Sequence, residues 1–282
     1  MHPCDRLALE AAVAIADAGI ARPVLVGAPG RVDAAAGAAG IDIGRFERVA
    51  SDDGADAAVA GRAAATRAAA LARDGAVGAL MKGSLHTDEL LSAVVRKESG
   101  LRGERRIGHA FLFDLPRYPK LLALADCVVN IAPDLRTKRD ILGNGLDLLR
   151  ALGVARPKAG ILAAVETVNP QIPATVDAAA LVAEAAGGAF GDALVEGPFG
   201  FDNAISAEAA RTKGIESSVS GDADLLLVPD LNAGNILYKS FVYVGGGECA
   251  GLVLGAKVPV VLTSRADSLV ARVASVALAV SA

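Results

Sequence analysis

Four segments that follow predicted buried strands combine glycine with polar or charged residues, and these residue types could bind an anionic small molecule. Because ligands of open parallel sheets bind beyond the carboxyl ends of the strands, polar residues there are the first candidates for chemistry. The four segments are MKGSLHT (81–87), GPFGFDN (197–203), PDLNAGN (229–235) and LTSRADS (262–268).

The segment at 229–235 is the most informative of the four. Asp230, Asn232 and Asn235 surround a predicted helix start, and Gly234 would allow a close approach to the backbone. A helix N-terminus offers amide groups and a partial positive charge, which suit phosphate or an oxyanion. The alternative is ordinary helix capping by Asn232, but capping needs one polar residue rather than three around a glycine. We therefore expect this segment to bind substrate.

A serine–arginine pair follows the last predicted strand. Arg265 could hold a phosphate through two parallel hydrogen bonds, with Ser264 beside it. Alternatively, Ser264 or Asp267 caps the final helix and Arg265 is solvated. The residues alone leave both interpretations open.

The segment that begins at Lys82 also follows a buried strand. Lys82 and Gly83 could meet a phosphate, and His86 or Thr87 could contact substrate. From its residue type alone, however, His86 is more often a surface or capping histidine than a catalytic base.

Other common site chemistry is missing from the sequence. It contains no Walker loop, nucleophile elbow or metal-ligand cluster, so we predict no metal site. The three cysteines are an odd number without paired spacing, which argues against a disulfide framework. Cys127 lies in a predicted apolar strand, 127–132, and is expected to be buried there.

The order of predicted elements indicates an α/β fold with mainly parallel sheets, because apolar strands alternate with alanine-rich helices. The pattern restarts near residue 150, which favours two α/β domains: 1–150 plus 258–282, and 151–257. Strands are predicted at 23–26, 76–81, 107–115, 127–132, 158–165, 192–196, 224–228 and 258–262. Helices are predicted at 5–18, 53–73, 87–97, 135–152, 177–186, 203–211 and 233–243, with one more after 265.

The charge and hydropathy of the sequence argue against nucleic acid and membranes as partners. The formal net charge is −4 and no basic run is present, so nucleic acid is not an expected partner. No stretch of 18 consecutive apolar residues occurs, so we expect no membrane span. The N-terminus carries charge early and has no apolar signal core. The odd cysteine count without paired spacing favours a reducing cytoplasm.

Five segments together resemble the phosphate acetyl/butyryltransferases. The resemblance runs from about residue 3 to the last helix, and the LTSRADS and LMKG forms are more similar to the butyryltransferase branch. The segments are LMKGSLHT (80–87), NIAPDLRTKRDIL (130–142), GPFGFDNAIS (197–206), PDLNAGNILYK (229–239) and VVLTSRADS (260–268).

The resemblance implies an enzyme of isocitrate-dehydrogenase-like architecture, with an active cleft between two domains. It implies the reaction of acyl-CoA with inorganic phosphate to give acyl phosphate and CoA, with CoA as a substrate and no permanently bound cofactor. In that family a serine–arginine pair lies at the site, and the matching residues are Ser264 and Arg265. The arginine would hold the phosphate, and the serine would steady charge at the thiol or carbonyl. A homodimer is the family-level expectation.

The sequence departs from the acetyltransferase pattern at two positions. An aspartate that is proposed as the base for the CoA thiol is replaced by Ala271. An arginine in the helix after the LMKGSLHT segment is replaced by about Ala93, and Arg96 lies one turn further along. Spacing of three residues in a helix would put Arg96 on the same face, where it could take over the role.

Two further functions stay open at this point. A nicotinamide- and metal-dependent dehydrogenase has the same architecture, but it should present several aspartates to one divalent cation. Asp222 and Asp224 flank the start of a strand, which is the wrong end for a site, and a dinucleotide-binding glycine fingerprint is missing. A CoA-binding homologue with weakened catalysis is the other alternative, because the expected acid is absent at Ala271.

Overall fold

The computed structural model describes residues 1–263 and 267–282, which divide into two compact α/β units. Unit 1 comprises Met1–Glu104 and Ala250–Ala282, and unit 2 comprises Arg105–Cys249. This division differs from the predicted boundary at residue 150. Residues 105–150 belong to unit 2 because their strands and helix pair and pack with the strands of that unit.

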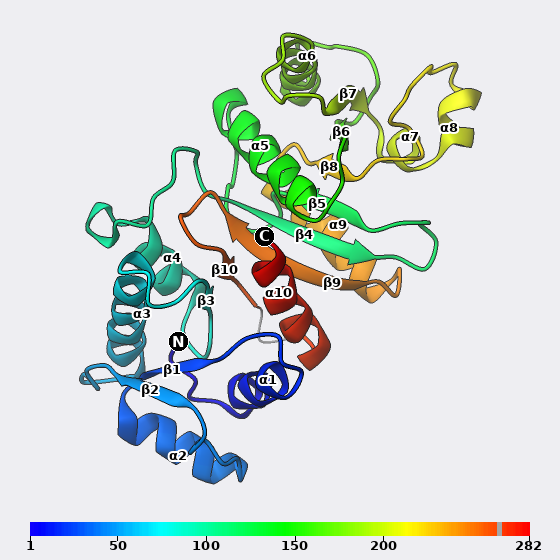
Figure 1. The fold of residues 1–282 in the computed structure, drawn as a ribbon. Helices are drawn as coiled ribbons and strands as arrows, with labels where there is room; N and C mark the ends of the chain where they lie inside the picture. The colour runs from blue at the N-terminus through cyan, green and yellow to red at the C-terminus, as the bar shows by residue number, and fades with distance from the viewer. Residues whose placement is uncertain (264–266) are drawn as a thin grey trace. The chain divides into compact units, whose positions relative to one another are not determined.

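Unit 1 contains two small groups of strands with helices around them (Figure 1). In the first group β1 and β2 are parallel. In the second, β3 is parallel to β10, which is antiparallel to β9. The elements are α1 (Arg6–Asp17), β1 (Val24–Gly27), α2 (Pro29–Ala39), β2 (Glu47–Ala50), α3 (Ala57–Arg73), β3 (Leu80–Met81), α4 (Thr87–Val95), the 3₁₀ helix η1 (Lys97–Ser99), β9 (Glu248–Leu254, mostly in unit 1), β10 (Val260–Val261) and α10 (Leu269–Ser281).

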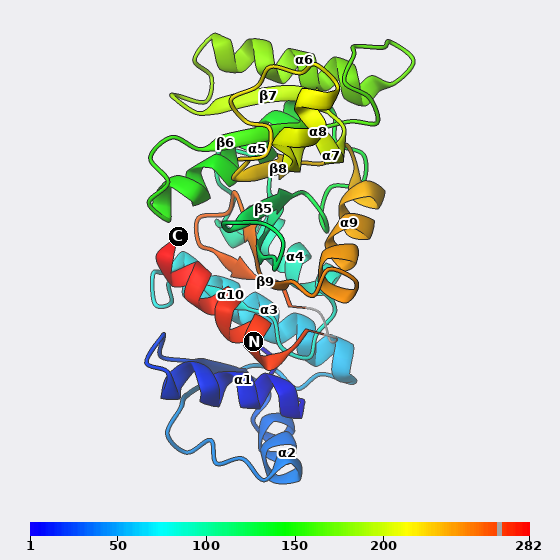
Figure 2. The same ribbon diagram turned by 90° about the vertical axis from the view of Figure 1, so that its right-hand side faces the viewer.

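Alanine-rich helices contribute to the core of unit 1. Asp5 caps α1 by accepting a hydrogen bond from the Ala8 N–H at 2.7 Å, and Asp56 caps α3 in the same way through Val59 at 2.8 Å. The buried face of α3 consists of alanine and glycine, whose small side chains allow close packing. Helices α1 and α10 lie side by side in both views (Figures 1 and 2).

Unit 2 is built on a mainly parallel sheet with the strand order β4-β5-β8-β6-β7. Only the β4–β5 pair is antiparallel among these strands. Helices α5 and α9 cover opposite faces of this sheet (Figures 1 and 2). The elements are β4 (Gly108–Asp114), β5 (Leu122–Ala125), α5 (Leu135–Ala151), β6 (Lys158–Leu162), α6 (Pro173–Ala186), β7 (Leu194–Phe199), α7 (Phe201–Ile205), α8 (Ala207–Thr212), β8 (Leu225–Leu227) and α9 (Leu231–Tyr243).

The predicted α/β class with mainly parallel sheets is confirmed. Some individual strands and helices, however, were predicted wrongly or were not predicted. The predicted strand at 127–132 is a loop, and the strand before it, β5, was not predicted. The reason is local: the Asp126 carboxylate accepts hydrogen bonds from the Val128, Val129 and Asn130 amides at 2.9–3.1 Å and folds the chain into a turn. Helix α2 and strands β2 and β9 were also missed. Within the described residues, none of the helices combines the length and apolar character needed to cross a membrane.

Candidate functional site

The loop after β3 holds one group of predicted site residues in unit 1. The Lys82 side chain is buried, and its Nζ donates to the carbonyls of Leu85 at 3.2 Å and Gly83 at 3.4 Å. Gly83 has a steric reason to be glycine, because a Cβ there would lie 2.5 Å from the Met1 carbonyl oxygen. The chain is therefore tightly fixed at the carboxyl end of β3, with one ammonium group held beneath the loop.

His86 and Thr87 begin helix α4 at the end of this loop. His86 is exposed, and its N–H donates to Oε2 of the buried Glu89 at 3.0 Å, while Arg62 contacts the other carboxylate oxygen at 3.3 Å. His86 thus occupies the N-cap position, which the sequence favoured from residue type.

Arg96 does not lie on the helical face that the sequence predicted. Helix α4 ends at Val95, and Arg96 has an extended backbone with φ −58° and ψ 140°. The helical spacing argument was therefore wrong: Ala93 is buried, whereas Arg96 is exposed at the helix end.

Ser264 and Arg265, the two predicted catalytic residues, lie outside the described residues. Thr263 comes directly before them, after β10, and its buried hydroxyl has no hydrogen-bond partner among the residues that the structure describes. The register of β10 with β3 brings Thr263 to the same edge as Lys82, whose N–H donates to the Val261 carbonyl at 3.0 Å.

A second cation of unit 1 was not singled out from the sequence. Arg272 on α10 is buried, and burial lowers the pKa of its guanidinium while the carboxylates of Asp5 and Asp267 oppose this shift. The available signal was a single arginine within an otherwise apolar helix.

The start of helix α9 holds the other predicted group, in unit 2. Asp230, rather than Asn232, caps the helix: its carboxylate accepts from the Ala233 N–H at 3.0 Å. The Leu231 amide donates to the Ile131 carbonyl at 3.0 Å, and the Gly234 amide donates to the Asp230 carbonyl at 3.0 Å. Three amides at this helix start therefore already have partners within unit 2.

Two members of this group fasten the helix to the loop at 126–131. A Cβ at Gly234 would lie 2.7 Å from the Asp126 carbonyl oxygen, so glycine is required by the protein's own backbone. Asn235 donates from Nδ2 to the Cys127 carbonyl at 3.3 Å. Asn232 is exposed, whereas Gly234 is buried.

The loop at 126–131 is a part of the site region that residue patterns missed. The buried Asp126 carboxylate accepts four hydrogen bonds, the fourth from Asn130 Nδ2 at 2.7 Å. Asn130 in turn accepts at Oδ1 from Arg106 Nε at 3.1 Å, and Arg106 is exposed. An oriented guanidinium therefore lies at the carboxyl end of β5, where anionic ligands of parallel sheets bind. The sequence signal was the 130–142 segment together with the arginine pair at 105–106.

His109 lies on β4 at the same edge of the unit 2 sheet, because Ala110 is opposite Ala125 at the end of β5. Both of its ring nitrogens are buried without a partner among the described residues, and its ring packs on Phe111 with 4.3 Å between centroids. Burial lowers the pKa of His109 to about 4, although the charge of Asp126 opposes the shift, so the imidazole is neutral at neutral pH.

Asp222 and Asp224 pair with lysines, and Cys127 is buried. Asp224 accepts from Lys120 Nζ at 2.6 Å and from the Lys158 N–H at 2.7 Å, and Asp222 also pairs with Lys120 at 2.8 Å. No group of three His, Cys, Asp or Glu side chains within residues 1–263 and 267–282 could hold a metal ion. Cys127 is buried as expected, in the loop rather than in a strand, and burial raises the pKa of its thiol.

The structure thus brings the predicted residues together in two groups. Lys82, Gly83, His86 and Thr87 share one strand end of unit 1, and the residues from Asp230 to Asn235 share one strand end of unit 2. Each unit therefore has its own set of polar residues at the carboxyl ends of parallel strands.

Comparison with known proteins gives a consistent result. Residues 53–280 match the family model described as phosphate acetyl/butaryl transferase. A phosphate acetyltransferase of Rhizobium meliloti is 47% identical over 278 residues, which are 99% of this chain and 86% of the relative. A phosphate butyryltransferase of Clostridium acetobutylicum is 36% identical over 275 residues, 98% of this chain and 89% of the relative.

A solved structure agrees with these relatives. The crystal structure of a branched-chain phosphotransacylase from Enterococcus faecalis V583 is similar with a TM-score of 0.74 and 34% sequence identity, covering 84% of this chain and 82% of the other. The family model covers most of the chain, and the curated relatives align along nearly all of it. With its two α/β units and the polar groups at their strand ends, the chain belongs to the phosphate acetyl/butyryltransferase family of acyltransferases.

Proposed function

We propose that the protein transfers a short acyl group between CoA and inorganic phosphate. A phosphate oxygen attacks the thioester carbonyl carbon, the carbon–sulfur bond breaks, and CoA leaves as the thiolate, which takes up a proton; the second product is acyl phosphate. The observation that carries this proposal is the alignment of almost the whole chain with acetyl- and butyryl-transferring relatives at 36–47% identity.

We propose Ser264 and Arg265 as the catalytic residues. The arginine would hold phosphate through paired hydrogen bonds, and the serine would steady charge at the thiol or carbonyl. A thiol such as that of cysteine has an ordinary pKa of about 8.5, and a neighbouring cation that lowers the pKa of a thiol by about one to two units contributes roughly 1.4–2.7 kcal/mol. Orientation of phosphate against the carbonyl contributes more, because positioning replaces a bimolecular encounter.

The remaining predicted residues of unit 1 are proposed to bind substrate. In unit 1 these are Lys82, Gly83, His86, Thr87 and Arg96, of which His86 and Arg96 have exposed side chains.

In unit 2, we propose that Asn232 and the exposed Arg106 contact substrate. Asp230, Gly234 and Asn235 hold the helix start and the neighbouring loop in place through the contacts described above. These three are therefore positioning residues in the proposal.

The alternatives can be separated by one assay. Release of free thiol from acetyl-, propionyl- and butyryl-CoA is measured with and without phosphate. The proposal expects thiol release that depends on phosphate, and the panel gives the preferred acyl chain. Measurable CoA binding without thiol release would instead indicate a catalytically weakened homologue. The dehydrogenase reading receives no support from the relatives, and Asp222 and Asp224 are engaged with lysines.

The proposed oligomeric state, location and substrates of the enzyme follow from the same family. We propose a homodimer in the cytoplasm, with acyl-CoA and phosphate as small-molecule substrates and no permanently bound cofactor. The resemblance to the family supports the dimer, and light scattering coupled to size exclusion would show a monomer if this part is wrong.

A further inference from the structure

Most basic side chains on helix α5 and in the arginine pair at 105–106 form ion pairs within unit 2. These pairs are Arg105–Asp147 at 2.5 Å, Lys138–Asp177 at 2.7 Å, Arg139–Glu184 at 3.0 Å and Arg150–Asp147 at 3.1 Å. Arg106 and Arg136 are the exceptions: neither guanidinium group has a carboxylate of the described residues within 4.0 Å. Both side chains are exposed. Two positive charges at this end of the helix are therefore not neutralised by an ion pair of the described chain.

Arg106 is held in place by the loop that follows β5. Its Nε donates to Oδ1 of the buried Asn130 at 3.1 Å, and its backbone N–H donates to the Asp140 carboxylate at 2.9 Å. The two terminal nitrogens of Arg106 make no hydrogen bond to the part of the chain that the structure describes. A guanidinium that is fixed at Nε keeps its terminal NH₂ groups in one orientation, and such a planar fork suits a phosphate.

Asp134 lies near both arginines at the start of α5. Its carboxylate caps the helix by accepting a hydrogen bond from the Thr137 N–H at 2.8 Å. Hydrogen bonds from Thr137 lower the pKa of Asp134 most, and the charges of Arg106 and Arg136 lower it further, so the two guanidinium groups lie close to one carboxylate. Asp134 and Asp140 each accept from a backbone N–H already, and both arginines keep donors for a ligand.

Ile131 adds an apolar side chain to the same loop. It is 72% exposed, and its carbonyl accepts from the Leu231 N–H at 3.0 Å, which fixes its backbone to the start of α9. Ile131 follows Asn130 directly and lies five residues before Arg136. The segment 130–136 and Arg106 therefore offer two guanidinium groups and one apolar side chain, which match a ligand that has both phosphate and apolar parts.

We infer, on the basis of the proposed function, that Arg136 together with Arg106 binds a phosphate group of CoA, and that Ile131 contacts an apolar part of the same molecule. CoA carries its phosphates at the nucleotide end, and an arm with methyl and methylene groups separates them from the thiol. Inorganic phosphate must instead lie at the thioester, where Arg265 is proposed to hold it. The arginine pair therefore acts in binding, equally in the ground state and the transition state, and not in the chemical step.

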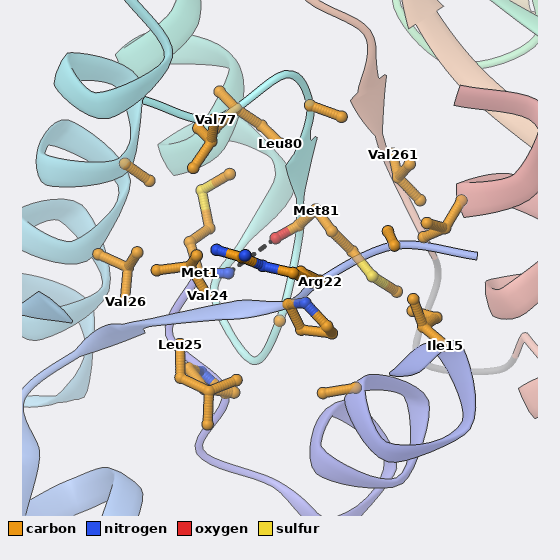
Figure 3. A pocket seen from close by; sticks show the side chains of 18 of the residues that line it. Met1, Ile15, Arg22, Val24, Leu25, Val26, Val77, Leu80, Met81 and Val261 are labelled. Carbon is orange, nitrogen blue, oxygen red and sulfur yellow. Dashed lines mark hydrogen bonds between the residues drawn. The ribbon is translucent and has the colours of Figure 1, made fainter. Parts of the chain in front are cut away.

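The cavity of unit 1 is a poor position for these phosphates. It has a volume of about 580 Å³, and most of the side chains that line it are apolar (Figure 3). The buried Met1 amino group in its lining donates to the Met81 carbonyl at 2.9 Å. A multiply charged phosphate would lose its hydration among the apolar side chains at a high cost in free energy.

The experiment compares two thioesters in Arg136→Ala and in the unchanged protein. One is the acyl-CoA that the panel identifies as preferred, and the other carries the same acyl group on pantetheine, which lacks the phosphates of CoA. Arg136→Ala should raise KM for acyl-CoA by about 5- to 20-fold and leave kcat within about twofold, because it removes a charge-assisted contact of binding. Arg136→Lys should lie between. KM for acyl-pantetheine and for inorganic phosphate should not change.

Arg139→Ala is the matched control, because it removes an exposed cation of the same helix that already pairs with Glu184. It should leave KM for acyl-CoA unchanged, and Tm should be the same in both variants.

Several results would overturn the assignment of Arg136. These are an unchanged KM for acyl-CoA in Arg136→Ala, an equal rise for acyl-pantetheine, a rise in KM for inorganic phosphate alone, or an equal rise in Arg139→Ala. If the unchanged protein releases no thiol, the proposed function fails, and titration calorimetry with CoA tests the arginine pair separately. Arg136→Ala should then weaken CoA binding by about 5- to 20-fold, and equal affinity of the two proteins would refute the assignment.

Discussion

Substitution of Gly234 by alanine should destabilise unit 2, although alanine is in general the better helix former. An alanine Cβ would lie 2.7 Å from the Asp126 carbonyl oxygen and 3.0 Å from the Cys127 Cα, both backbone atoms that cannot rotate away. The helix would gain about 0.8–1 kcal/mol from alanine, whereas overpacking costs about 1–3 kcal/mol. We therefore expect a net loss of up to about 2 kcal/mol in the free energy of unfolding.

This loss can be measured against a matched control. Tm should fall by up to about 8 °C in Gly234→Ala. The loop that orients Arg106 should also shift, which lowers kcat/KM for acyl-CoA. Gly37→Ala in helix α2 is the control, because no atom lies within 4 Å of its added Cβ; it should keep or raise Tm. The steric reasoning is refuted if Gly234→Ala is as stable as the unchanged protein.

Further predictions address the site directly. Arg265→Ala should abolish phosphate-dependent thiol release while circular dichroism stays unchanged, and unaltered kinetics would remove Arg265 from the mechanism. Arg106→Ala should raise KM for acyl-CoA by about 5- to 20-fold, or about 1–2 kcal/mol, with Tm unchanged, and Arg106→Lys should lie between; an unchanged KM contradicts its role. The folded pKa of His109, about 4, lies below its ordinary value near 6.5, so the stability it contributes is present above pH 6.5 and is lost as pH falls toward 4. Denaturant unfolding should show this loss, up to about 3 kcal/mol, and His109→Gln should reduce it; identical pH profiles would exclude it. Thiol release should continue after treatment with a chelator, and its loss would indicate a metal requirement.

The helix start at Asp230 shows what residue patterns could predict. Polar residues at a strand end identified the place, and helix α9 begins within two residues of the predicted position. The pattern could not assign the partners. Asp230 and Asn235 bond to groups of unit 2 itself, and Gly234 is required by a loop that is about a hundred residues away in sequence.

The loop after β5 shows why the remaining site features escaped prediction. Val128 and Val129 have strand-forming side chains, but their amides bond to the Asp126 carboxylate. Hydrogen bonds of this kind, from backbone amides to a side chain, override the strand preference of the two valines. The periodicity of apolar residues in the sequence does not reveal them. The arginine pair at 105–106 gave no indication that Arg106 would donate a hydrogen bond to Asn130.

The single carboxylate of Asp126 has a consequence for the variation that this loop can tolerate. All four hydrogen bonds to the Asp126 carboxylate come from N–H donors. A side-chain amide at this position would replace one acceptor oxygen by an NH₂ group, which would face another N–H donor. Asparagine, the nearest match in shape, is therefore a poor replacement at this position. The exposed ion pairs of the same protein should accept far larger changes, since their partners can turn to water instead.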